Sequence, residues 1–170
     1  MPKKVKASRK KVAGKKKKAV KPAYLREIQI RYKKKRVKAG SPIGKRIAGA
    51  KQVFELFSDL QNDGKEKLVT ISLDVRLKAI CFEVVAIGSL CAVYARPVEM
   101  LRAAIPLNPY GIIVVHNHPS GEAEPSSEDK EFTKKLKRST EDLGLVFHDH
   151  VIIGDGDYYS FAEAGSMAKL

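Results

Sequence analysis

The sequence predicts an α/β protein of the α+β class, with a mixed central sheet flanked by helices. Five short segments are either alternately or continuously apolar, as strands are. Three longer segments repeat apolar residues at steps of three and four, as amphipathic helices do. Because the two kinds of segment intermix along the chain, the helices are expected to pack on one shared sheet.

The ends of the three helices are marked as clearly as their periodicity. Residues 47–60 have helical spacing and stop at the Asp-Gly pair at 63–64. The second helix opens at Pro97, since proline suits a first helical turn. The third covers 127–143 and stops at Gly144. The inward residues of the second helix are expected to be Met100, Leu101, Ala104 and Ile105.

The strands are expected between these helices and after the last one. Residues 111–115 form a short apolar run that suits a central strand buried on both faces. A Gly-Asp-Gly turn at 154–156 separates the last two strands. In chain order the predicted strands cover residues 66–74, 80–87, 111–115, 145–153 and 158–161.

Charge divides the chain into two parts. Residues 1–46 hold 20 Lys or Arg and a single acid, Glu27, for a net charge of +19, whereas residues 47–170 have a net charge of −5. The first 22 residues are too poor in apolar side chains to offset the entropy of ordering. Residues 24–32 alternate enough for an edge strand. We therefore predict a basic, largely disordered arm at 1–46 and one compact domain at 47–170.

Composition excludes several protein classes. No apolar run is long enough for a membrane span, and no apolar stretch follows the basic start as it would in a secretory signal. Cys81 and Cys91 lie in apolar stretches, where buried free thiols are expected rather than a disulfide framework or a zinc ribbon. A cytoplasmic protein is expected, with nucleoid association as an option through the arm.

The chemically informative segment begins with His116-Asn117-His118-Pro119. Two histidines at i and i+2 beside a buried strand can aim both imidazoles at one point if the chain bends. Asp129 follows in the first turn of the next helix. Two nitrogens and one carboxylate leave a fourth position open, which is the pattern of a catalytic zinc site.

Each piece also has a simpler interpretation. The two histidines could be surface loop residues. Ser126 and Asp129 have the spacing of a capping box that opens a helix. His148 and His150 form a second His-x-His pair that would share one face of a strand, as a second metal site or, in the case of His150, as a packed residue beside the first.

The joint spacing of His116, His118, Ser126 and Asp129 resembles the JAMM metalloprotease signature. The runs HNHPSG, EKLVTISLD and IIGDGDYYSF, with the pair Asp-His at 149–150, resemble the RadC-like subgroup of JAB (JAMM, MPN-type) domains. The likeness extends over residues 28–165. It implies a JAB/MPN-type fold, a three-layer architecture like that of the cytidine deaminases. A Lys-rich arm stands where full-length RadC-like proteins carry a helix-hairpin-helix module.

The resemblance also implies residue roles. His116, His118 and Asp129 would bind Zn²⁺, Glu66 would be the catalytic carboxylate, and Ser126 would help orient the oxyanion. From the residues alone, Glu66 could equally be an exposed acid at a strand end. Glu83 within an apolar strand is the rival carboxylate, and Glu99 is expected on a helix surface.

Three functions follow from this pattern. The first is a zinc-dependent hydrolase of the metallopeptidase type with an unidentified protein or peptide substrate, in a family associated with DNA repair. The second is a metal-dependent phosphodiesterase to which the arm supplies DNA. The third is a binding module whose arm holds DNA or RNA through its charge.

Overall fold

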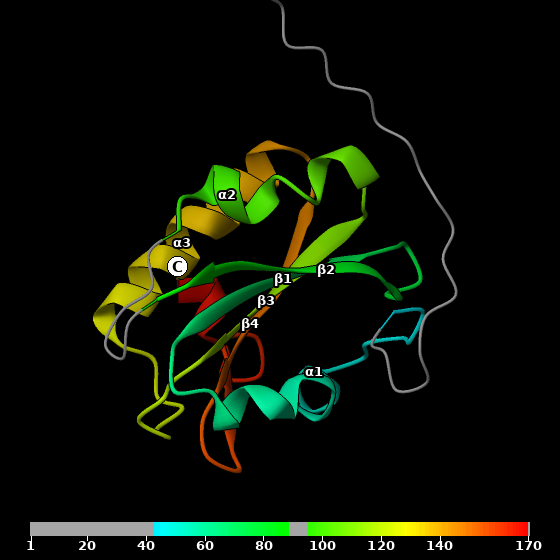
Figure 1. The fold of residues 1–170 in the computed structure, drawn as a ribbon. Coiled ribbons are helices and arrows are strands. Elements are labelled where there is room, and N and C mark those ends of the chain that lie inside the picture. Colours follow the sequence, from blue (N-terminus) through cyan, green and yellow to red (C-terminus); the bar gives the residue numbers. More distant parts are fainter. Residues whose placement is uncertain (1–42, 89–94, 170) are drawn as a thin grey trace, which may run out of the picture. The chain divides into compact units, whose positions relative to one another are not determined.

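The computed structural model describes residues 43–88 and 95–169. The predicted arm up to residue 42, its edge strand at 24–32, and Cys91 lie outside these described residues. The described chain forms a five-stranded sheet with helices on both sides (Figure 1). Its elements in order are α1 (Ala50–Phe57), a 3-10 turn (Ser58–Asn62), β1 (Lys67–Leu73), β2 (Ala79–Ile87), α2 (Pro97–Leu101), a 3-10 turn (Ile105–Leu107), β3 (Gly111–Asn117), α3 (Ser127–Asp142), β4 (Val146–Ile153), β5 (Tyr158–Ser160) and a 3-10 turn (Ser166–Lys169).

The sheet has the strand order β2-β1-β3-β4-β5. Strands β3 and β4 are parallel and are joined through α3, whereas all other neighbours are antiparallel. A parallel pair needs such a crossover, because the chain must return to the same end of the sheet. The crossover brings the end of β3 and the first turn of α3 to the same edge.

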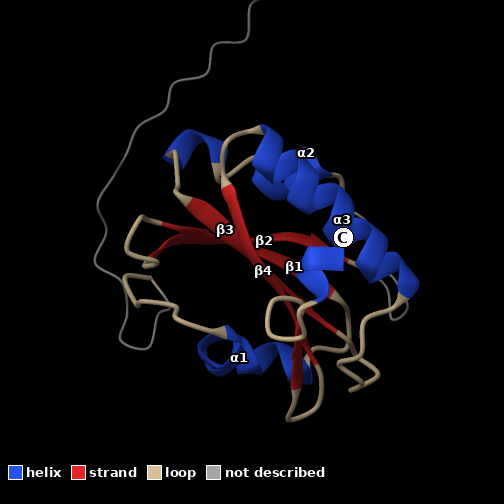
Figure 2. Ribbon diagram, turned by 180° about the vertical axis from the view of Figure 1, so that it is seen from behind, coloured by secondary structure: helices blue, strands red, loops and turns tan. Residues whose placement is uncertain are grey.

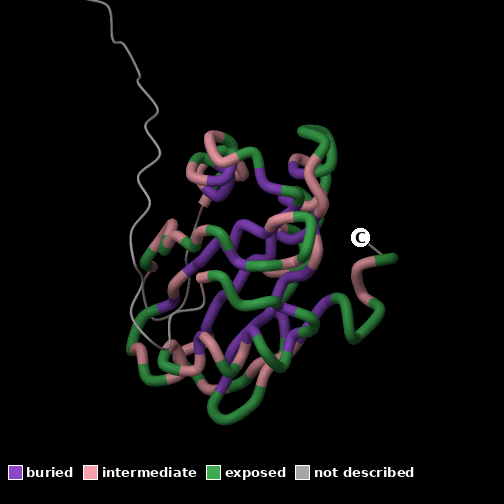
Figure 3. The backbone as a smooth tube through the Cα atoms, turned by 90° about the vertical axis from the view of Figure 1, so that its right-hand side faces the viewer, coloured by how far each residue is buried: buried purple, intermediate pink, exposed green. Residues whose placement is uncertain are grey.

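Helix α1 covers one face of the sheet, and α2 with α3 cover the other (Figures 1 and 2). Strand β3 shows how the layers form, because its residues alternate between the two cores. Ile113 and Val115 pack on the α1 side, whereas Ile112 and Val114 pack with α2 and α3. All seven residues of β3 are buried, as expected of a strand covered on both faces. Buried segments run through the middle of the described domain, and exposed segments lie around them (Figure 3). The predicted mixed sheet with helices in three layers is confirmed.

The chain ahead of α1 already belongs to this domain. The Gly44 N–H donates to the carbonyl of Ala79 at 2.6 Å, and the Ala79 N–H donates to the carbonyl of Lys45 at 3.0 Å. The described residues before α1 thus add a short pairing beside the turn between β1 and β2.

Three local expectations were wrong. Helix α2 ends at Leu101, and Ile105 is 53% exposed instead of facing inward, because it begins a separate 3-10 turn and does not continue α2. Strand β3 runs two residues further than expected and includes His116. Cys81 is only partly buried, since β2 is an edge strand of the described sheet.

No helix among the described residues has the length and apolar character needed to cross a membrane.

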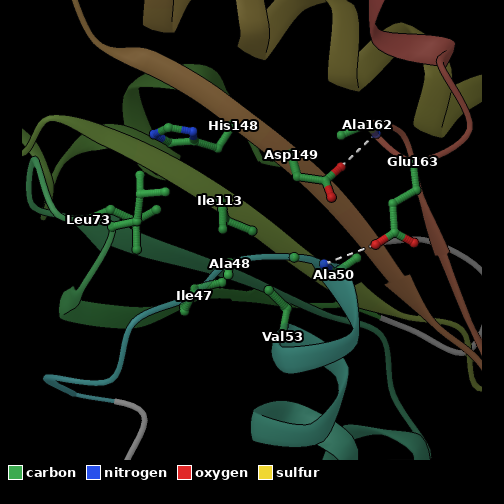
Figure 4. Close-up of a pocket in the computed structure, with 12 residues that line it drawn as sticks. Ile47, Ala48, Ala50, Val53, Leu73, Ile113, His148, Asp149, Ala162 and Glu163 are labelled. Atoms are coloured by element: carbon green, nitrogen blue, oxygen red, sulfur yellow. Dashed lines mark hydrogen bonds between the residues drawn. The ribbon is translucent and has the colours of Figure 1, made fainter.

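The buried carboxylate of Asp149, on β4, binds residues at and just after the end of β5. Asp149 is 7% exposed and accepts hydrogen bonds from the Ser160 hydroxyl at 2.6 Å and from the Ala162 N–H at 2.9 Å (Figure 4). Burial raises the pKa of Asp149 to about 6 in spite of these two bonds. The folded protein therefore holds this proton at pH values where the unfolded chain has lost it.

We predict that Asp149 makes the stability of the protein fall as pH rises from about 4 to about 6. The folded state binds more protons than the unfolded state in this window, so the change is on the order of 2–3 kcal/mol. Asp149→Asn keeps an acceptor for Ala162 and a partner for Ser160 but has no proton to lose. Urea unfolding of both proteins at pH 4.5 and pH 7.5 measures the effect. If the free energies of unfolding of the two proteins differed by the same amount at both pH values, the raised pKa of Asp149 would be contradicted.

Candidate metal centre

The crossover brings His116, His118 and Asp129 together. His116 lies at the end of β3, His118 follows directly, and Asp129 is in the first turn of α3. His116 Nδ1 lies 3.5 Å from Asp129 Oδ1, and His118 Nε2 lies 3.3 Å from Asp129 Oδ2. One ligand atom from each residue lies within 4.8 Å of the other two. Within residues 43–88 and 95–169, this is the one group of His, Cys, Asp or Glu that could hold a metal ion.

The loop after β3 is held in its bend by backbone contacts. The His118 N–H donates to the carbonyl of Ile153 on the neighbouring strand at 3.0 Å. The Gly121 N–H then donates back to the His118 carbonyl at 3.0 Å, and Gly121 has a φ of +85° that favours glycine. A side chain at Gly154 would collide with the Gly121 carbonyl oxygen, so glycine is needed there for close packing. The turn after β4 thus supports the histidine loop.

Hydrogen bonding shows which nitrogen each histidine can offer. His118 Nδ1 lies 2.7 Å from the carbonyl oxygen of Glu122. Because a carbonyl only accepts, Nδ1 carries a hydrogen, so the neutral ring has its lone pair on Nε2, and Nε2 is the atom that faces Asp129. His116 Nδ1 is buried without a hydrogen-bond partner. Both histidines therefore present a nitrogen to the space beside Asp129.

Asp129 and Ser126 form the capping box of α3. The Ser126 N–H and hydroxyl both donate to Asp129 Oδ2, at 2.9 and 2.7 Å, and the Asp129 N–H donates to Ser126 Oγ at 3.1 Å. The box fixes the Asp129 side chain at the helix terminus, where the positive end of the helix dipole favours a carboxylate. In this structure the Ser126 hydroxyl orients the carboxylate.

The charge states suit a divalent cation. Burial would raise the pKa of Asp129, but the hydrogen bond with His118, the nearby His116 and the bonds from Ser126 hold it well below its usual range. Burial lowers the pKa of His116 to about 4, so its imidazole is neutral near pH 7. Burial also disfavours charge on His118, but Asp129, the Glu122 carbonyl and the charge of Glu66 together raise its pKa. Imidazole nitrogens with an ionised carboxylate are a donor set that zinc accepts, and the unpartnered Nδ1 of His116 is explained by it.

Glu66 lies at the same end of the sheet. It directly precedes β1, is 9% exposed, and is close enough to His118 to influence its pKa. The rival Glu83 is held in an ion pair with Arg102 at 2.8 Å on the edge strand β2. Glu99 takes part in the capping box of α2. Of the three acids considered from the sequence, Glu66 is the one that is buried and whose charge acts on His118.

Asn117 was not identified from the sequence as a site residue. Its side chain is fully buried between the two histidines in the chain, and it binds the backbone on both sides of Glu66. The only available signal was a polar residue at a position where a buried strand continues.

His148 and His150 do not share one face. A β-bulge makes His148 the extra residue of β4, because Ile112 pairs with Phe147 and Ile113 with Asp149. His148 consequently lines a cavity of about 380 Å³ on the α1 side, together with Ile113 and Asp149 (Figure 4). His150 is fully buried on the α3 side, with its ring centroid 5.6 Å from that of His116.

His150 belongs to the support of the metal centre. The Thr133 hydroxyl donates to the carbonyl of Asp129 at 2.5 Å and lies 2.7 Å from His150 Nδ1. Since that hydroxyl donates to Asp129, it accepts from Nδ1–H of His150. The imidazole also stacks on Phe161, with 5.2 Å between centroids. A chain of buried contacts therefore links the first turn of α3 to β4.

A groove of about 500 Å³ borders His116 and Asp129. Leu68, Pro97 and Phe132 contribute apolar surface, from β1, α2 and α3. Its charged lining residues are Arg96, Glu99, Glu128, Asp129, Glu131 and Lys135. The candidate centre therefore borders a partly apolar groove whose lining has more acidic than basic residues.

Comparison with known proteins places the chain within a protein family. The RadC-like JAB domain family matches residues 47–166. The chain is 39% identical over 140 residues to a UPF0758 protein of Aquifex aeolicus, covering 77% of this chain and 61% of the relative. It is 36% identical to one of Chlorobaculum parvum, over 76% of this chain and 59% of the relative, and 39% identical to one of Methanosarcina mazei, over 71% and 53%. The chain thus spans somewhat more than half the length of these relatives.

We predict that the purified protein binds one zinc ion per chain and that His116→Ala weakens binding at least tenfold. The substitution removes one of three converging ligand atoms. Zinc content by elemental analysis, and competition with a chelating dye, measure the effect. His148→Ala is the matched control, because it removes a half-buried imidazole on the other side of the sheet. Equal zinc affinity in wild type and His116→Ala would refute the site.

Proposed function

This chain belongs to the RadC-like JAB domain family, and we propose that it is a zinc-dependent hydrolase that cleaves amide bonds in proteins or peptides. The observation that carries the proposal is the convergence of two imidazole nitrogens and one ionised carboxylate beside a buried glutamate. Three ligands leave a coordination position open for substrate or water, unlike the four-ligand structural sites.

His116, His118 and Asp129 would hold the metal. A zinc ion in such a site acts as a Lewis acid and lowers the pKa of water bound to it. Glu66 accepts the proton of the attacking water at its carboxylate and returns it to the nitrogen of the leaving amine. The exposed Ser126 hydroxyl, which here donates to Asp129, turns to the substrate carbonyl oxygen and helps stabilise its developing charge.

The groove supports a protein substrate over a nucleic acid. Leu68, Pro97 and Phe132 offer contacts to an apolar side chain next to the scissile bond. The lining has four acids and two bases, so even with the two charges of a bound zinc ion it would offer a polyanion no net attraction. The one candidate ligand group among the described residues also differs from the paired ions of many phosphodiesterases.

The basic residues 1–46 favour a second activity of the chain, which is binding to nucleic acid. Their net charge of +19 contrasts with −5 for the remainder, so polyanions would be attracted to this segment and not to the domain. Tyr24 and Tyr32 are its two aromatic residues, which argues for phosphate contacts without extensive base stacking. Such binding would bring the hydrolase to proteins on DNA or RNA.

We predict that Glu66→Gln lowers the rate of hydrolysis by a factor of about 10² to 10⁴, because the amide cannot accept the proton. The assay uses metal-loaded protein with peptide, isopeptide and phosphodiester substrates. Zinc content should stay at the wild-type value, since Glu66 is not among the three converging ligands. Glu83→Gln is the control and should retain activity. Cleavage of phosphodiesters alone, lost in Glu66→Gln, would replace the amide-bond proposal with a nuclease.

We predict that affinity for duplex DNA falls steeply with salt and depends little on sequence. Replacing Lys15, Lys16, Lys17 and Lys18 by Gln should make the slope of log affinity against log salt shallower, by about 0.9 for each phosphate that the variant no longer neutralises. Fluorescence anisotropy with a labelled duplex, from about 50 to about 300 mM salt, measures the slope. An unchanged slope in the variant would exclude this lysine run as the binding segment.

A further inference from the structure

We infer that Asn117 is a positioning residue that holds Glu66 for proton transfer. This inference rests on the proposed hydrolase function. Asn117 is the last residue of β3 and is fully buried. Its Oδ1 accepts a hydrogen bond from the Lys67 N–H at 2.8 Å, and its Nδ2 donates to the Lys65 carbonyl at 3.1 Å. One side chain therefore binds the backbone immediately before and after Glu66.

The bonds of Asn117 begin where the backbone pairing stops. The antiparallel register between β1 and β3 ends with Leu68 opposite His116. One step further along, the amide of Asn117 takes over the donor and acceptor functions of a strand backbone. On the opposite side, the Gly88 N–H donates to the Glu66 carbonyl at 2.8 Å. Residues 65–67 are thus held from both neighbouring strands although they precede most of β1.

This arrangement aims the Glu66 side chain toward the metal centre. Side chains two residues apart on a strand share a face, and Leu68 packs on the side of α2 and α3. Glu66 continues on that side, which is also the side of His116. The electrostatic effect of Glu66 on His118 agrees with this direction. The chain therefore places the holder of Glu66 directly between its two metal-binding histidines.

The residue type matters at this position. A primary amide has an acceptor and a donor at fixed spacing, and both are used on backbone groups here. Alanine offers neither, and aspartate keeps the acceptor but loses the donor. His118 has anchors of its own in the carbonyls of Ile153 and Glu122, and His116 is held opposite Leu68 in the pairing of β1 and β3. Loss of the Asn117 amide should therefore displace Glu66 more than it disturbs metal binding.

A displacement of about 1 Å in a proton-transfer group can cost on the order of 10²-fold in rate. We expect Asn117→Ala to lower kcat by about 10- to 100-fold, with KM and zinc content close to wild type. The kcat of Asn117→Asp should lie between those of wild type and Asn117→Ala. In a Glu66→Gln background, Asn117→Ala should change the residual rate by less than about threefold, because the group that it positions has already lost its function.

The double-mutant cycle separates positioning from general support of the fold. A merely structural role would give the same factor in both backgrounds, and this result would overturn the inference. Hydrogen exchange provides a measurement that does not need activity. The Lys67 amide should lose protection in Asn117→Ala, whereas the Leu68 amide, next along β1, should keep it. Unchanged protection of Lys67 would likewise overturn the inference.

Asp74→Ala is the matched control. It removes two side-chain bonds to the Arg76 and Lys78 N–H groups at the other end of β1. It should leave kcat unchanged. If Asn117→Ala does not fold, Asn117→Asp carries the cycle. A metal-loaded wild type that is inactive on every amide substrate overturns the hydrolase proposal and the positioning role together. An active wild type with equal factors in both backgrounds overturns only the positioning role.

Discussion

The parallel crossover from β3 through α3 to β4 is the constraint on which the site depends. It places the end of a buried strand against the first turn of a helix, so residues eleven or more positions apart can share one small volume. The strand end contributes the imidazoles of His116 and His118, and the helix contributes the carboxylate of Asp129. The same helix terminus favours the ionised state of that carboxylate through the Ser126 N–H and the helix dipole. The positions of the three candidate ligands and the ionised state of Asp129 therefore both follow from the crossover.

Buried polar residues around the centre are tolerated because each of them contacts the next one in space. Thr133 joins the carbonyl of Asp129 to the ring of His150, and that ring lies between His116 and Phe161. Removing one member of such a chain would leave a buried donor or acceptor without a partner, which costs about 1–3 kcal/mol. The first turn of α3 is in this way fastened to β4 by side chains as well as by the crossover. These contacts help to hold the candidate ligands in place.

Periodicity in the sequence predicted the layers well, because burial on one or two faces determines which positions must be apolar. The central strand β3 and the helix α3 are clear examples. The errors occur where a local departure breaks the period. The bulge at His148 moves that side chain to the face opposite His150, and the change from α2 to a 3-10 turn leaves Ile105 exposed. A bulge has no signature in a single sequence, since it is defined by its partner strand. The candidate ligands, the capping box of Ser126 and Asp129, and the packed position of His150 could be expected from spacing and from the family resemblance. Asn117 could not be recognised, because its partners are backbone atoms of residues about 50 positions away.

The centre also has a cost that links its function to the stability of the fold. His116 Nδ1 and His150 Nε2 are buried without hydrogen-bond partners among the described residues. An unpaired buried polar atom destabilises the folded state, and His116 Nδ1 lies 3.5 Å from an ionised carboxylate that is itself partly desolvated. A cation bound by His116 and Asp129 would satisfy the first atom and the charge together. Because the unfolded chain does not hold the three ligands in place, the free energy of that binding would add to the stability of the fold. The residues that make the folded domain less stable without a ligand are thus the ones that make it suited to bind a metal ion.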